Sequence, residues 1–133
     1  MKKTGQCLCG AVKFTAKNAN INMGVCHCDM CRKACSGPFF AVECEDSVTF
    51  ESEENVARHE SSEWGQRGFC KVCGSTLFYY LKPKSAYMMS AGLFDNQDDF
   101  VFDHQIFIDE KPDYYCFSND TMNKTGEEVM SGE

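Results

Sequence analysis

Closely spaced cysteines are the feature that most constrains this chain. Three thiols fall within residues 26–31, and two further doublets lie before and after that segment. The seven cysteines of these segments are Cys7, Cys9, Cys26, Cys28, Cys31, Cys70 and Cys73. Thiols separated by one or two residues can turn onto one cation without a long loop, and zinc favours such soft sulfur ligands. The pattern predicts metal binding, and it raises the question of how seven thiols divide among ions that take four ligands each.

Spacing favours one division of these thiols and leaves others open. The two flanking doublets make a closed set, which we call the four-thiol cluster, and this set would staple an N-terminal strand to a later hairpin as a structural zinc does. The three-thiol cluster of Cys26, Cys28 and Cys31 would then lack one ligand, which is the arrangement of a catalytic or ligand-binding zinc. An alternative grouping joins Cys26 and Cys28 to the later doublet.

Three cysteines remain outside these segments: Cys35, Cys44 and Cys116. Cys44 lies in an apolar run and Cys116 stands beside Phe117, so both are predicted to be buried small apolar residues. Cys35 follows Cys31 by four residues, and its thiolate could close the three-thiol cluster or remain free.

Composition narrows the class of protein. The chain has 133 residues, enough for one domain with a modest core, and a net charge of −7 that argues against a nucleic-acid or anionic-membrane partner. The first residues lack the apolar stretch of a signal peptide, and no apolar run reaches the ~18 residues that span a membrane. We therefore expect a cytoplasmic protein, in which ten cysteines indicate metal ligands or reactive thiols rather than disulfides.

Short runs of β-branched and aromatic residues, separated by polar turns, predict a mainly β single domain. The expected strands cover residues 6–8, 11–15, 21–25, 39–42, 48–50, 56–60, 66–69, 77–81, 86–91 and 100–108. Residues 29–34 are expected to form one helical turn that ends at Gly37 and Pro38. The domain is assigned to residues 1–121, and the polar residues 122–133 are expected to form a flexible tail.

Three segments in order, residues 5–10, 26–33 and 67–74, carry a family resemblance. The chain resembles the glutathione-dependent formaldehyde-activating enzyme family, which includes centromere protein V-like members. The resemblance implies a β-tent fold of short antiparallel strands with two zinc ions, a structural one in the four-thiol cluster and a catalytic one in the three-thiol cluster. It also implies a carbon–sulfur lyase that joins glutathione to formaldehyde as S-hydroxymethylglutathione. Relatives usually carry a small or hydroxyl residue at position 35, so the resemblance favours a free Cys35 thiol.

Basic residues near the clusters are candidates for binding glutathione. Arg32 and Lys33 follow the three-thiol cluster and Arg67 precedes the later doublet, and arginine suits a bidentate contact to a carboxylate. Alternatively, Arg32 and Lys33 only offset the charge of the thiolates. His27 lies between two ligands and could move a proton or bind metal, although a packed or exposed side chain is the favoured interpretation.

Three functions fit this sequence. The first is a zinc-dependent carbon–sulfur lyase that acts on glutathione and a small aldehyde. The second is a carrier that binds glutathione on zinc without chemistry. The third is an interaction scaffold whose second zinc is also structural and is closed by Cys35. The first two need an open position on the three-thiol zinc, and nothing in the sequence indicates the oligomeric state.

Overall fold

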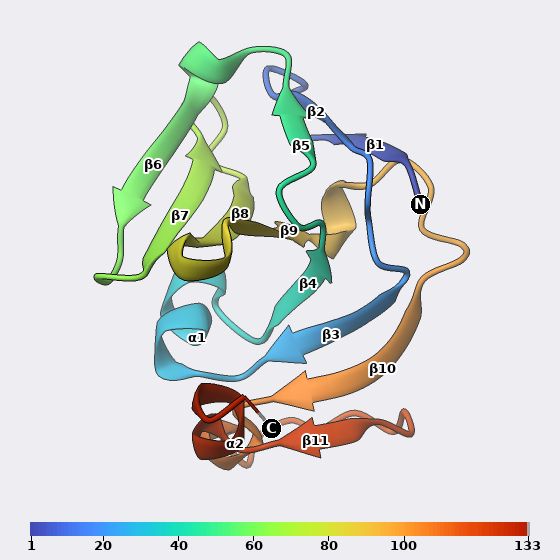
Figure 1. Cartoon of the computed structure of the whole chain (residues 1–133), viewed down its shortest axis with the longest axis vertical. Coiled ribbons are helices and arrows are strands. Elements are labelled where there is room, and N and C mark those ends of the chain that lie inside the picture. Colours follow the sequence, from blue (N-terminus) through green and yellow to red (C-terminus); the bar gives the residue numbers. More distant parts are fainter. Residues whose placement is uncertain (133) are drawn as a thin grey trace.

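The computed structural model describes residues 1–132, within which eleven strands form two sheets (Figure 1). The small sheet has the order β1 (Lys3–Gln6), β2 (Lys13–Ala16), β5 (Val48–Phe50). The large sheet has the order β11 (Met122–Lys124), β10 (Val101–Ile106), β3 (Asn22–Cys26), β4 (Phe39–Glu43), β9 (Ala86–Ser90), β8 (Thr76–Leu81), β7 (Gly65–Cys70), β6 (Val56–Glu60). The helices are α1 (Asp29–Cys35) and α2 (Gly126–Met130), and the 3-10 turns are η1 (Glu53–Asn55), η2 (Lys82–Lys84), η3 (Ala91–Leu93) and η4 (Ile108–Glu110).

The mainly β prediction is confirmed, with one correction to the strand directions. Most neighbouring strands are antiparallel, but β10 pairs in parallel with both β3 and β11. Between β9 and β10 the chain crosses to the small sheet, where Phe94 forms a bridge with Gly5. This long connection returns the chain to the end of the large sheet from which β9 started, so β10 runs in the same direction as β3.

Aromatic side chains fill the space between the two sheets. The Phe50 ring of the small sheet lies 6.4 Å from the Phe14 ring and 5.6 Å from the Phe78 ring of the large sheet, measured between centroids. Phe14 and Phe78 are almost fully buried, and Cys7 and Cys70 belong to the same apolar cluster. A second, smaller cluster consists of Cys26, Cys31 and Phe39, so each thiol cluster borders its own part of the core.

The C-terminal segment returns to the large sheet. Strand β11 pairs with β10, and α2 begins with a capping box in which the Thr125 side chain accepts from the Glu128 backbone N–H. The Gly126 N–H donates to Asp109 Oδ1 at 2.8 Å, which ties α2 to η4. Residues 122–132 of the predicted tail thus carry a strand and a helix, and their flexibility in solution stays a prediction.

Two further expectations concern burial and membranes. Cys44 is buried as predicted, but Cys116 is exposed, so its predicted burial is wrong. It follows the half-buried Tyr115 on a segment without regular secondary structure, in which exposed and half-buried residues alternate. Across residues 1–132, the helices are too short or too polar for any of them to span a membrane.

Candidate metal centres

The four-thiol cluster joins loops from the two sheets. Cys7 and Cys9 lie in the loop between β1 and β2, while Cys70 ends β7 and Cys73 follows it. The four Sγ atoms lie within 4.8 Å of one another, with distances of 3.7 Å from Cys7 to Cys9 and 3.9 Å from Cys9 to Cys70. Four sulfurs about 2.3 Å from one zinc ion would stand about 3.8 Å apart. The donor set and its spacing therefore fit a tetrahedral metal ion.

Backbone N–H groups point at the sulfurs of this cluster. Val12 N–H donates to Cys7 Sγ at 3.3 Å, and Val72 N–H donates to Cys70 Sγ at 3.4 Å. Such contacts stabilise thiolates and orient them for a metal. A hydrogen bond with the Ser75 hydroxyl is the main reason that the pKa of Cys73 falls to about 5.

Two glycines close the loops that carry these thiols. Gly10 and Gly74 follow Cys9 and Cys73 directly, and both have φ of +80°, a conformation that a side chain disfavours. Their N–H groups donate to the carbonyls of the first thiol residue in each loop, at 3.2 Å for Gly10 and 2.8 Å for Gly74. The glycine after each doublet is thus what lets the loop turn tightly enough to bring its two sulfurs together.

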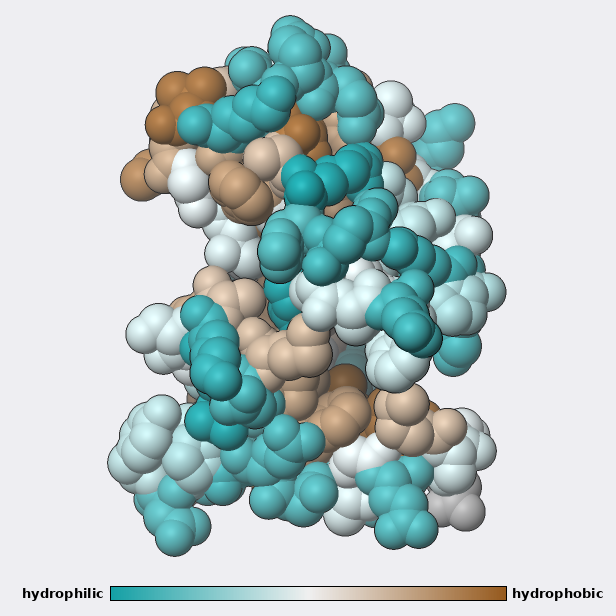
Figure 2. All heavy atoms as spheres, turned by 90° about the vertical axis from the view of Figure 1, so that its left-hand side faces the viewer, coloured by the Kyte–Doolittle hydropathy of each residue, from teal (hydrophilic) through white to brown (hydrophobic). Residues whose placement is uncertain are grey.

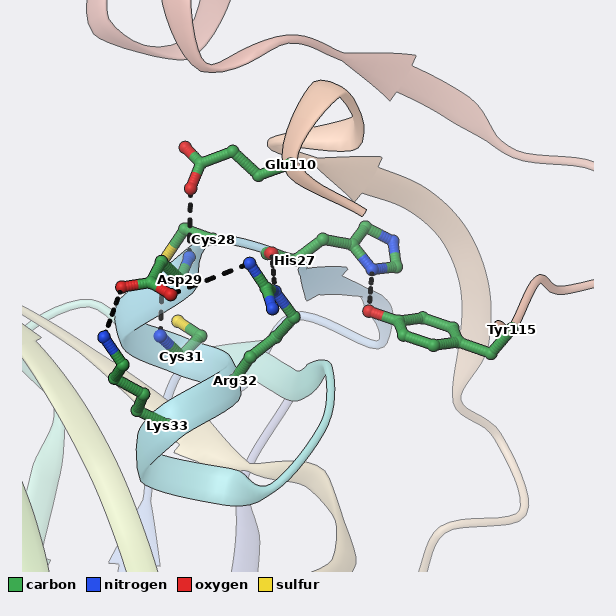
Figure 3. A network of polar contacts seen from close by, with 8 residues as sticks. All are labelled: His27, Cys28, Asp29, Cys31, Arg32, Lys33, Glu110 and Tyr115. Carbon is green, nitrogen blue, oxygen red and sulfur yellow. Dashed lines mark hydrogen bonds and ion pairs between the residues drawn. The ribbon is translucent and has the colours of Figure 1, made fainter. Parts of the chain in front are cut away.

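The three-thiol cluster forms where β3 passes into α1. Cys26 ends β3, Cys28 is the N-cap of α1 and Cys31 lies on its first turn. Their Sγ atoms lie within 4.8 Å of one another, and Cys28 Sγ accepts from the Cys31 N–H at 3.3 Å (Figure 3). Hydrogen bonds from the Cys26 and Cys31 thiols lower the pKa of Cys28, which favours the thiolate form that a metal binds.

Cys35 stands beside the three-thiol cluster without joining it. The residue is partly buried and packs against Cys26, Cys31 and Phe39. Its Sγ atom does not lie within 4.8 Å of all three cluster sulfurs, whereas those three lie within that distance of one another. Burial raises the pKa of the Cys35 thiol, which favours the protonated form over a metal-binding thiolate.

Arg32 and Lys33 lie on α1 beside the cluster and share one acidic partner. Asp29 accepts from Lys33 Nζ at 2.9 Å and lies 3.8 Å from Arg32 Nη2 (Figure 3). Arg32 also donates from Nε to the His27 carbonyl at 3.0 Å, which braces the loop between the first two thiols. The Lys33 side chain is 78% exposed and remains free to reorient toward a ligand.

Arg67 reaches the three-thiol cluster from the other end of the large sheet. It lies on β7 opposite Tyr79 of β8, and its guanidinium carbon stands 4.9 Å from the centroid of the Tyr79 ring. From this position Arg67 Nη2 donates to Cys31 Sγ at 3.6 Å. Arg67 precedes Cys70 of the four-thiol cluster by only three residues, but its side chain contacts the three-thiol cluster.

His27 is fully buried and turns away from the thiols. Its Nδ1 lies 2.8 Å from the Tyr115 hydroxyl (Figure 3), and its Nε2 lies 2.7 Å from Gln105 Oε1. Gln105 donates from Nε2 to the Thr121 hydroxyl, so its oxygen is the acceptor and His27 carries its proton on Nε2. Burial lowers the pKa of His27, in keeping with a neutral ring. The favoured expectation, that His27 is packed or exposed rather than a metal ligand, agrees with this buried position.

Three other residues that contact the site were not identified from the sequence. Glu110 accepts from the Asp29 N–H at 3.0 Å, and Tyr79 and Tyr115 hold Arg67 and His27 as described above. The contacts of Glu110 and Tyr115 join segments distant in sequence, and no motif marks them, whereas the Tyr79 contact lies between two consecutive strands. The face that carries α1, β6 and β7 is shown in Figure 2, where the outline is indented at mid-height and weakly apolar residues lie level with and below the indentation.

Known proteins resemble this chain over most of its length. Residues 2–110 match the family model of the glutathione-dependent formaldehyde-activating enzyme. An uncharacterized lyase of Schizosaccharomyces pombe is 41% identical over 127 residues, which are 95% of this chain and 93% of the relative. A Halomonas elongata protein, provisionally named a glutathione-dependent formaldehyde-activating enzyme, is 27% identical over 85 residues, 57% of this chain and 54% of that protein.

A solved structure supports the architecture independently. The crystal structure of a Rhodobacter sphaeroides protein matches 70% of this chain and 88% of its own, with a TM-score of 0.61. The two sequences are 19% identical over this match, so the likeness shows the fold alone.

Proposed function

Because this chain belongs to the glutathione-dependent formaldehyde-activating enzyme family, we propose that it is a zinc-dependent carbon–sulfur lyase that acts on glutathione and a small aldehyde. The observation that carries the proposal is the three-thiol cluster, in which Cys26, Cys28 and Cys31 converge and Cys35 does not complete the set. Three protein ligands with one position left for water or substrate are typical of catalytic zinc sites. The lyase name of the Schizosaccharomyces pombe relative agrees with this class of reaction.

The proposed reaction adds a thiol to a carbonyl. Free glutathione has a thiol pKa of about 8.5, so little of it is nucleophilic at neutral pH. A zinc ion in the three-thiol cluster would supply a position at which a thiol binds in its deprotonated form. The sulfur forms a bond to the aldehyde carbon, and the carbonyl oxygen becomes a hydroxyl by taking up a proton. With formaldehyde the product is S-hydroxymethylglutathione, and the lyase direction breaks the same carbon–sulfur bond.

Residues of α1 are proposed to orient the tripeptide. Arg32 and Lys33 lie one and two residues after Cys31, and both contact the exposed carboxylate of Asp29. A carboxylate of glutathione can replace Asp29 as the partner of Lys33 at little cost, since exposed ion pairs contribute only about 0–1 kcal/mol. Arg67 is proposed to lie near the glutathione sulfur, because its guanidinium group already contacts Cys31 of the cluster.

The four-thiol cluster is proposed to hold the second zinc ion in a structural role. Its four sulfurs leave no position for a substrate in a tetrahedral site. All ten cysteines are free thiols in the structure, and this pattern supports the proposed location in the reducing cytoplasm.

Cobalt substitution tests the open position, because the d–d and thiolate bands of cobalt report its coordination. The protein is loaded with Co²⁺ and titrated with glutathione, and product formation from ¹³C-formaldehyde is followed by NMR in the zinc form. A glutathione-dependent spectral change together with turnover above the uncatalysed rate supports the enzyme. A spectral change without turnover supports the carrier, and no spectral change supports the scaffold. Cys35→Ser should retain both metal ions and the response to glutathione.

A further inference from the structure

Arg67 is held in place from two sides. The Tyr79 ring lies under its guanidinium group at 4.9 Å, and the Cys31 sulfur accepts from its Nη2 at 3.6 Å. Strand pairing places Arg67 between His59 of β6 and Tyr79 of β8, on the middle strand of a three-stranded part of the large sheet. A planar cation stacked on an aromatic ring loses little freedom when it makes a further contact. The side chain is therefore preorganised toward the thiols.

The contact between Arg67 and Cys31 matters because the three-thiol cluster would be negatively charged when it holds a metal ion. Three thiolates around a divalent cation leave one net negative charge, and a fourth thiolate adds another. The chain as a whole already carries a net charge of −7. The cations on α1 are shared with the Asp29 carboxylate, whereas Arg67 contacts a sulfur directly. An anionic sulfur ligand thus approaches a negative centre that Arg67 can bring close to neutrality.

We propose that Arg67 is a positioning residue that acts through Cys31 to neutralise the three-thiol centre and thereby lets it accept a fourth, anionic sulfur ligand. The inference rests on the proposed function and deepens it by assigning selectivity for thiolate over neutral ligands. The guanidinium group acts on the sulfur end of the ligand and therefore on any thiol. This distinguishes it from a residue that binds a carboxylate of glutathione, which would act on glutathione alone.

The test compares two thiols on the cobalt-substituted protein. Glutathione carries carboxylates and 2-mercaptoethanol does not, while both bind as thiolates. Arg67→Met should weaken the binding of both thiols at least tenfold and by similar factors. Arg67→Lys keeps the charge and should restore the affinity for both to within about threefold. Imidazole, a neutral ligand, should bind Arg67→Met as well as or better than the wild type.

Arg58→Met is the matched control. Arg58 lies on the adjacent strand β6 and also stacks on aromatic rings, 5.0 Å from Phe78 and 5.9 Å from Tyr87. Its hydrogen-bond partners are Glu53, Gln66 and Tyr87. This variant removes the same charge from the same sheet and should leave both thiol affinities unchanged. If Arg67→Met fails to retain two cobalt ions, Arg67→Gln takes its place in every comparison.

Three results would overturn the proposal. Affinity lost for glutathione but kept for 2-mercaptoethanol would assign Arg67 to a carboxylate. Equal losses in Arg67→Lys and Arg67→Met would show that shape rather than charge matters, and unchanged affinities would remove the role altogether. A wild-type protein that responds to neither thiol is a separate outcome, because it refutes the open position on which the proposed function depends.

Discussion

Tyr115→Phe should destabilise the protein by breaking a hydrogen-bond chain behind the three-thiol cluster. The chain runs from the Tyr115 hydroxyl to His27 Nδ1, from His27 Nε2 to Gln105, and on to Thr121. Tyr115 lies outside residues 2–110 that match the family model, yet its hydroxyl binds the residue between the first two thiols of the cluster. The substitution removes a single oxygen and keeps the ring that covers His27.

The size of the effect follows from burial. His27 is fully buried, so after the substitution its Nδ1 has an acceptor lone pair without a donor and without free access to water. An unsatisfied buried acceptor costs about 1–3 kcal/mol, and each kcal/mol lowers the thermal midpoint of a domain of this size by roughly 3–5 °C. We therefore expect a midpoint about 3–15 °C lower than that of the wild type.

Tyr114→Phe is the control for this experiment, because Tyr114 is the neighbouring residue and is 78% exposed. Its thermal midpoint should stay within about 2 °C of the wild type, since an exposed substitution usually changes stability by no more than about 0.5 kcal/mol. Both variants are melted at one fixed excess of zinc, so that mass action on the metal is the same. Equal midpoints for the two variants would refute the idea that His27 depends on the Tyr115 hydroxyl.

Three other predictions follow. Freshly reduced protein should contain two zinc ions by elemental analysis, and a mild chelator should remove one sooner than the other; loss of both at one rate argues against an open site. Cys70→Ser should lower the thermal midpoint far more than Cys28→Ser, and equal losses contradict the assigned roles. The hydrogen bond from Lys3 lowers the pKa of Asp99, so this pair stabilises the fold at neutral pH and stops doing so in acid. The midpoint difference between wild type and Asp99→Asn should therefore stay constant from pH 7 to about 4 and shrink as the pH falls further, and a difference that persists unchanged in stronger acid would contradict this.

Much of the fold could be predicted from local pattern. The helical turn expected at residues 29–34 is α1 (Asp29–Cys35), and most of the apolar runs form strands near their expected bounds. The first strand was misplaced, because Cys7 and Leu8 belong to the ligand loop and the strand is β1 (Lys3–Gln6). This segment has no apolar alternation, and the buried stem of Lys3 takes the place of an apolar residue. Strand β11 could not be recognised from its sequence either, because its extended conformation depends on pairing with β10.

In the candidate site, too, the local contacts could be predicted from the sequence and the distant contacts could not. Residue spacing predicted that the thiols within each doublet lie together, because they are neighbours in the chain, but it only favoured the division of the doublets that the structure shows over the alternative that joins Cys26 and Cys28 to the later doublet. The binding of metal to them stays a prediction. Arg67 meets Cys31 across 36 residues, and Tyr115 meets His27 across 88. Such pairs depend on how distant segments of the chain are arranged in the folded protein, which no spacing rule encodes.

The two thiol clusters differ in what they connect, and this difference favours different roles for them. The four-thiol cluster joins a loop of the small sheet to a loop of the large sheet, so a metal there would crosslink the two layers around the aromatic core. The three-thiol cluster lies within one stretch of chain between β3 and α1, and the sheets are joined without it. A change of ligand at a crosslink would loosen the core, whereas a change of ligand at a local site leaves it intact. This difference favours the three-thiol cluster as the place where a metal would exchange its fourth ligand, next to the contact of Arg67 with Cys31.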